Sequence, residues 1–138
     1  ENVECSPGTT LFWDWGYHQS FRDLPFEFAA VLVTRIISRP GTDLICLDLG
    51  HKAVAAENPL DNRVAFLNLP GAEVMGHSEE HLVVKVKNNR DYFIGQVVYG
   101  IPWHICPTTA LYDRVYVIEE NRFTHNWHVI ARDRIIKH

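Results

Sequence analysis

Short apolar runs separated by turn residues make up the hydrophobic pattern of the chain. The strongest run, 29–38, is rich in Val and Ile and stops at Pro40-Gly41, which predicts a strand. A second run at 44–48 follows after a tight turn, so we expect these two strands to form a β-hairpin. The last two strands are expected to form a closing hairpin around Glu120-Asn121. Similar runs predict the remaining strands at 64–67, 73–76, 82–86, 96–99, 114–119 and 122–130.

Two segments between these strands favour helical structure. Residues 51–59 are expected to form a short helix or a helical turn that stops at Pro59. Residues 104–112 are expected to include a short helix with Pro107 at its first position, where the missing N–H costs nothing. About eight short strands and one or two short helices predict a mainly β fold class, a single domain built as a β-barrel or sandwich.

Composition narrows the class of protein. The chain has 138 residues, of which 46% are hydrophobic and 22% charged, which fits one soluble globular domain. A net charge of -4 and scattered basic residues argue against nucleic-acid or membrane partners, and no apolar run is long enough to span a bilayer. Three cysteines without framework spacing favour a reducing, cytoplasmic location over a disulfide scaffold. Because the first residues include no Met and no signal-peptide pattern, we expect a processed protein or a piece of a larger one.

The sharpest chemical pattern is the pair His104 and Cys106, separated by one residue. In an extended backbone, residues two apart point the same way, so an imidazole and a thiolate could meet at one point. Both are good zinc ligands, and two protein ligands suit an open site completed by water or substrate. The alternative is that Cys106 is a small buried apolar residue and His104 an ordinary loop histidine.

A second polar cluster is the run from His77 to His81. On a helix, the two histidines would lie one turn apart and could chelate a metal. The flanking residues favour a strand end or bend instead, where His77, Glu79 and His81 would share one face. A carboxylate beside a histidine can then fix its tautomer, whereas the alternative is a solvated polar turn.

Two further segments have structural interpretations. Asp48 is expected to cap the turn that follows it, and Lys52 to lie on the surface. The aromatic segment Trp13–His18 is expected to pack in the core, with a pocket lining or a partner-domain contact as the alternatives.

The ordered motifs resemble one known family over nearly the whole chain. The motifs that carry the resemblance are E-C-S-P-G-T at 4–9, S-R-P at 38–40, L-D-L-G-H-K-A at 47–53, S-E-E-H at 78–81, P-W-H-I-C-P-T at 102–108 and L-Y-D-R-V-Y-V at 111–117. In this order they resemble the C-terminal domain of metal-activated pyridoxal-phosphate enzymes, typified by D-threonine aldolase and eukaryotic-type D-serine dehydratase, which are relatives of alanine racemase.

The resemblance implies roles for four residues. His104 and Cys106 match the family's metal pair, and Glu80 and His81 match its Glu-His element, which we expect to be catalytic. Dehydratases of this type bind zinc through His and Cys, whereas the aldolases tend to have Asp in place of Cys and use other divalent ions. Zinc is therefore the expected metal, with manganese or magnesium as alternatives, because a thiolate suits zinc better.

The resemblance also implies a larger enzyme. Family members have an N-terminal (β/α)₈ barrel with the cofactor lysine, and none of the four lysines of this chain matches that residue. The implied activity is a lyase acting on small D-3-hydroxy amino acids, in which the metal contacts the substrate 3-hydroxyl. Pyridoxal phosphate would be bound mainly by the absent barrel, the enzyme would be a homodimer, and the isolated domain would be inactive. The alternatives are an amino acid racemase of the same superfamily, or a free-standing β-barrel that serves as a ligand-binding or dimerisation module.

Overall fold

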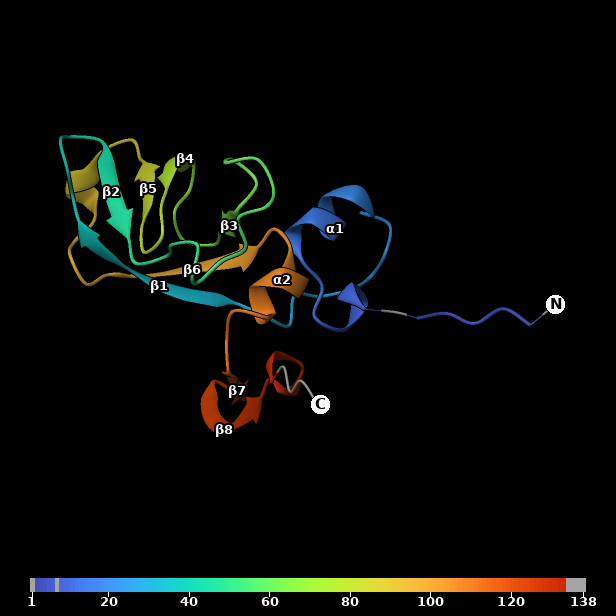
Figure 1. Cartoon of the computed structure of the whole chain (residues 1–138). Helices are drawn as coiled ribbons and strands as arrows, with labels where there is room; N and C mark the ends of the chain where they lie inside the picture. Colours follow the sequence, from blue (N-terminus) through green and yellow to red (C-terminus); the bar gives the residue numbers. More distant parts are fainter. Residues whose placement is uncertain (1, 7, 134–138) are drawn as a thin grey trace, which may run out of the picture.

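The main sheet of the computed structural model, which describes residues 2–6 and 8–133, is antiparallel throughout. Its six strands follow the order β3-β6-β1-β2-β5-β4 and curl into a half-barrel (Figure 1). The mainly β fold class is therefore confirmed. The strands are β1 (Leu32–Ser38), β2 (Leu44–Leu47), β3 (Val64–Phe66), β4 (Glu73–His77), β5 (Leu82–Lys85) and β6 (Val97–Pro102).

Alternation along the strands places the core on the inner face of the curl. In β1, Leu32, Thr34 and Ile36 are buried, while Val33 between them is exposed. The predicted β1–β2 hairpin is confirmed, with Ile36 opposite Leu47. The buried apolar residues of the inner face include Ile36, Ile45, Leu47, Leu49, Val54, Leu82, Val84 and Val98.

A separate two-stranded hairpin follows the main sheet. It consists of β7 (Arg114–Glu119) and β8 (Arg122–His128), so the expected hairpin is confirmed, although β8 ends two residues earlier than expected. No described strand of the main sheet pairs with it. Glu120 and Asn121 both have positive φ, as a tight two-residue hairpin turn requires. Figure 1 shows the hairpin, in red, set apart from the curled sheet. Its exposed apolar side chains are Tyr116, Ile118, Phe123 and Trp127.

The helices are short and depart from the sequence expectations. The described residues form α1 (Trp15–Ser20), α2 (Ile105–Thr109) and 3₁₀ turns at Thr9–Leu11, Asn89–Asp91 and Ile130–Arg132. None of the helices in this part of the chain is long and apolar enough to cross a membrane. In α2, Pro107 is the third helical residue and not the first, which still lies in the first turn, where a missing N–H costs little.

The expected helical turn in the segment 51–59 is confirmed at its start, where the Val54 N–H donates to the Gly50 carbonyl, and no helix follows. Two other sequence expectations need correction. Strand β1 begins three residues later than expected, because the Ala29 N–H donates to Phe12 of the N-terminal segment. Asp48 caps no following turn, since its Oδ1 accepts from Thr34 Oγ1 and the Arg35 N–H and so ties β2 to β1. Pro7 of the E-C-S-P-G-T motif and Lys137, one of the four lysines, lie outside the described residues.

Candidate functional site

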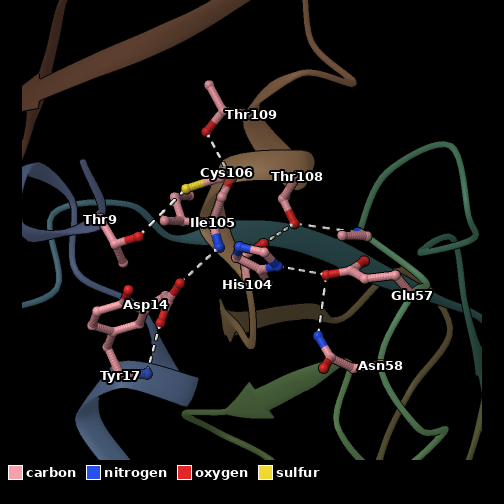
Figure 2. Close-up of polar contacts among 11 residues, drawn as sticks. Thr9, Asp14, Tyr17, Glu57, Asn58, His104, Ile105, Cys106, Thr108 and Thr109 are labelled. Atoms are coloured by element: carbon pink, nitrogen blue, oxygen red, sulfur yellow. Dashed lines mark hydrogen bonds and ion pairs between the residues drawn. The ribbon is translucent and has the colours of Figure 1, made fainter. Parts of the chain in front are cut away.

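The buried carboxylate of Asp14 joins the two helices at one point. Its Oδ1 accepts from the Tyr17 N–H of α1 at 2.9 Å, and its Oδ2 accepts from the Ile105 N–H of α2 at 3.0 Å (Figure 2). Asp14 is 1% exposed, so one side chain caps two helix N-termini inside the protein. The first residue of α2 is thereby fixed in place, and His104 immediately precedes it.

His104 is the residue before α2, and its backbone is extended. Its Nδ1 lies 2.6 Å from Glu57 Oε1, an oxygen that also accepts from Asn58 Nδ2 at 3.1 Å (Figure 2). An ionised carboxylate can only accept, so this contact requires a proton on Nδ1. Nε2 makes no hydrogen bond to the residues that the structure describes, and in a neutral ring it is the nitrogen that carries the lone pair.

Partly buried hydrogen bonds hold the loop that carries Glu57 against α2. The Thr108 hydroxyl donates to the His104 carbonyl at 2.7 Å and accepts from the Ala55 N–H at 3.2 Å. The Tyr112 hydroxyl donates to the Ala53 carbonyl at 2.7 Å, and burial raises the pKa of Tyr112, which keeps it a donor. His104 and Glu57 are therefore positioned by the same short helix.

Cys106 is an exposed free thiol on the first turn of α2. The structure contradicts its interpretation as a buried apolar residue. Its Sγ lies 3.4 Å from Thr9 Oγ1, whereas the His104 ring is directed toward Glu57 (Figure 2). Because α2 begins at Ile105, strand alternation does not relate the two side chains, and that part of the sequence argument is wrong. They lie on one helix N-terminus with different hydrogen-bond partners.

The donor set at α2 fits an open zinc site in its chemistry. An imidazole Nε2 and a thiol are both present, and both side chains are accessible from outside. No group of three or more His, Cys, Asp or Glu residues that could hold a metal occurs in the described part of the chain. A metal here would therefore complete its coordination with water or with groups from outside the described residues.

An open pocket of about 320 Å³ lies beside His104. Tyr17 of α1 and Phe21, which follows that helix, contribute to its wall, and the segment after β6 contributes Trp103. The helix approaches Trp103 closely because residue 16 is glycine, since an added Cβ would lie 2.8 Å from the Trp103 carbonyl oxygen. The aromatic segment Trp13–His18 is expected to pack in the core, and Trp13 is fully buried. Tyr17 lines the pocket instead, which is the alternative expectation.

The polar run 77–81 forms the turn between β4 and β5. His77 ends β4, which confirms the expected strand end. The Ser78 N–H donates to the His81 carbonyl and closes a turn, so the shared face expected for His77, Glu79 and His81 is not confirmed. Glu80 forms an ion pair of 2.6 Å with the exposed Lys52, which also pairs with Glu79. No hydrogen bond or ion pair joins Glu80 or His81 to the α2 site within the described residues.

The three residues that organise the α2 site, Asp14, Glu57 and Thr108, did not stand out in the sequence. Asp14 has a recognisable signal, because Asp is a preferred residue immediately before a helix. Glu57 has none, since it meets His104 from 47 residues away through a loop of irregular structure. Thr108 lies within the conspicuous P-W-H-I-C-P-T segment but carries no signal of its hydrogen bonds.

Comparisons with known sequences identify one relative much longer than this chain and one of similar length. Residues 29–118, well over half of the chain, match the family model described as "Putative serine dehydratase domain". D-threonine aldolase from Arthrobacter sp is 29% identical over 133 residues, which are 94% of this chain but 34% of the aldolase. An uncharacterised protein of Mycobacterium bovis is 29% identical over 115 residues, which are 81% of this chain and 86% of that protein.

Solved structures share the fold. D-threonine aldolase from Filomicrobium marinum matches with a TM-score of 0.79 at 22% identity, over 94% of this chain and 35% of that one. D-threo-3-hydroxyaspartate dehydratase from Delftia sp. HT23 matches with a TM-score of 0.67 at 16% identity, over 88% and 37%. Solved variants of a dehydratase with this activity replace a histidine or, two positions later, a cysteine by alanine, the latter in a metal-free form.

This chain thus spans about a third of the length of the aldolase and dehydratase chains that it matches. The resemblance carried by its sequence motifs is confirmed by the family match and by the aldolase relative. The chain belongs to the serine dehydratase domain family.

Proposed function

We propose that this chain is the metal-binding C-terminal domain of a pyridoxal-phosphate-dependent lyase that acts on D-3-hydroxy amino acids. One observation carries the proposal: His104 and Cys106 are accessible at one helix N-terminus, with the spacing of the histidine and cysteine replaced in the dehydratase variants. The aldolase and dehydratase relatives support the reaction class. The substrates in the names of these relatives share one chemical feature, since each is a D-amino acid with a 3-hydroxyl group.

The residues of this chain would have separate roles at the metal, some as ligands and others in positioning those ligands. His104 would bind through Nε2 and Cys106 as a thiolate, while Asp14 and Thr108 keep the helix that carries them in place. A bound zinc ion supplies Lewis acidity to an oxygen of the substrate. The pocket beside His104, with Tyr17 and Trp103 in its wall, would hold the remainder of a small substrate and limit access of water. Roles for Glu80 and His81 remain a prediction from the resemblance.

The lysines of the described residues do not suit a Schiff base with pyridoxal phosphate. A Schiff base requires a neutral lysine, and Lys52 is held charged because its hydrogen bonds to Glu79 and Glu80 raise its pKa. Lys85 and Lys87 lie beside a small second pocket on the β5 side of the sheet, away from the residues that line the His104 pocket. The cofactor lysine would come from the N-terminal barrel that we propose for the whole enzyme.

That barrel, or a second copy of the chain, would find apolar surface to cover. The outer face of the sheet exposes Val33 opposite Tyr99, and Val31 and Leu67 are exposed as well. Large exposed apolar areas on a domain commonly mark an interface. A homodimer with barrel and β domain at its active site is therefore part of the proposal.

A lyase assay on the full product of the gene that contains this chain tests the proposal. We expect turnover of D-serine or D-threonine that falls at least tenfold with a chelator, with His104→Ala and with Cys106→Ala. The control Glu73→Ala changes an exposed residue of β4 and should keep full activity. Turnover that resists the chelator and both substitutions would contradict the metal role and would favour a racemase-type reaction.

A free-standing binding module is the second candidate, and one observation favours it. The match covers 86% of the Mycobacterium bovis protein, so a protein of nearly this size contains the domain with little else. In that case the pocket beside His104 would bind a small molecule without turnover. An in-frame (β/α)₈ barrel immediately upstream in the gene supports the enzyme, and a start codon immediately before the codon for Glu1 supports the module.

A further inference from the structure

We propose that Glu57 is a positioning residue that fixes the tautomer and direction of His104 and presents Nε2 to the metal. The inference rests on the proposed metal role of His104 and adds a residue to it. Metal-binding histidines commonly donate their second ring N–H to a carboxylate, which orients the ring and makes the other nitrogen a better ligand. The pair formed by His104 and Glu57 has that arrangement.

The geometry assigns the atoms. The 2.6 Å contact joins Nδ1 to Oε1, in the range of a charge-assisted hydrogen bond. With Glu57 ionised, Nδ1 carries a proton, and in the neutral ring Nε2 carries the lone pair. The ring nitrogen available to a metal is therefore the one on the side away from Glu57.

Both partners are held by the same scaffold, so the contact is not a chance meeting of two mobile side chains. The main chain of His104 accepts from Thr108, and the same hydroxyl anchors Ala55, two residues before Glu57. Asn58 donates to the carboxylate oxygen that faces the ring. A shift of the loop would move Glu57 and the ring direction together.

Stability does not explain this pair. The side chains are 41% and 45% exposed, and ion pairs this exposed contribute little to folding. A carboxylate fixed at hydrogen-bond distance from a proposed metal ligand is better explained by its effect on that ligand. Removal of Glu57 should accordingly leave the fold intact and change the imidazole.

The test follows the ¹⁵N signals of the His104 ring in the 138-residue chain, first without metal and then during titration with Zn²⁺. The wild type should show the Nδ1–H tautomer and a Zn²⁺-dependent change at Nε2. Glu57→Ala should lose the tautomer preference and bind Zn²⁺ about 10- to 100-fold more weakly. Glu57→Gln retains an acceptor oxygen for Nδ1–H and should fall between the two. The matched control Glu73→Ala should behave as the wild type, and thermal melts should show all variants folded.

The outcomes separate the two proposals. If His104→Ala and Cys106→Ala abolish Zn²⁺ binding while Glu57→Ala retains both the tautomer and the affinity, the role of Glu57 is overturned and the metal site stands. If Glu57→Gln loses as much affinity as Glu57→Ala while the tautomer is kept, Glu57 is a direct ligand and the positioning role is overturned. If the wild type shows no Zn²⁺-dependent change at His104, both proposals fail.

Discussion

His77 has a half-buried ring whose protonation the folded state opposes. Burial lowers its pKa from 6.5, and the nearby His51 and Arg63 lower it further, while the backbone of Gly50 and of Leu49 partly offsets them. The unfolded chain therefore binds more protons than the native chain when the pH falls below 6.5. The stabilising effect of the neutral ring is complete above that pH and is lost as the pH falls toward the native pKa.

This sign gives a prediction at the residue scale. Acidification from about pH 8 to pH 5 should lower the urea midpoint more in the wild type than in His77→Gln, since the amide does not titrate. His77 Nε2 lies 3.1 Å from the Leu49 carbonyl, and the Gln side chain can still donate there. The control His125→Gln changes an exposed histidine of β8. Equal slopes in the wild type and His77→Gln would show that His77 does not carry the effect.

At the element scale, the two short helices depend on one carboxylate. Helices of five or six residues are not stable by propensity alone, so α1 and α2 need their caps and their packing. Asp14→Ala removes the acceptor for Tyr17 in α1 and for the first residue of α2, Ile105. We expect a loss of about 2 kcal/mol or more in the free energy of unfolding, since each cap contributes about 1 kcal/mol.

Urea denaturation measures this loss, and two further variants interpret it. Asp14→Asn retains one acceptor oxygen and should lose less than Asp14→Ala. Asp61→Ala, in an exposed turn, should be close to the wild type. A loss in Asp14→Ala no larger than that in Asp61→Ala would show that the shared cap does not hold the helices together.

The same scale explains what the sequence could predict. Strands such as β1 and β7 were found because their alternation or β-branched content is local. Helix α1 was missed because its start depends on Asp14, whose second bond reaches a residue 91 positions away. His104 and Cys106 are close in sequence and form a visible motif, whereas Glu57 reaches the site only through the docked loop. The prediction that Asp48 caps the following turn is wrong because its hydrogen-bond partners lie on β1, and a local capping rule considers only neighbouring residues.

At the scale of the whole molecule, the chain supplies one part of the proposed chemistry. It offers a histidine, a thiol and a pocket at α2, whereas Lys52 is held in an ion pair, and under the proposal the cofactor lysine would come from the barrel. It also spans about a third of the aldolase that it matches. The hairpin β7–β8 exposes a further apolar area. An isolated two-stranded hairpin is only marginally stable, so we expect a partner to cover it. The central claim is therefore that His104 and Cys106 bind zinc within a larger enzyme.

Zinc X-ray absorption on the zinc-loaded gene product tests that claim most directly. The account predicts one sulfur ligand at about 2.3 Å with nitrogen and oxygen ligands at about 2.0–2.2 Å. Cys106→Ser should remove the sulfur contribution, and Cys46→Ser, in the half-buried strand β2, should keep it. A spectrum without a sulfur ligand, or one unchanged in Cys106→Ser, would contradict the account.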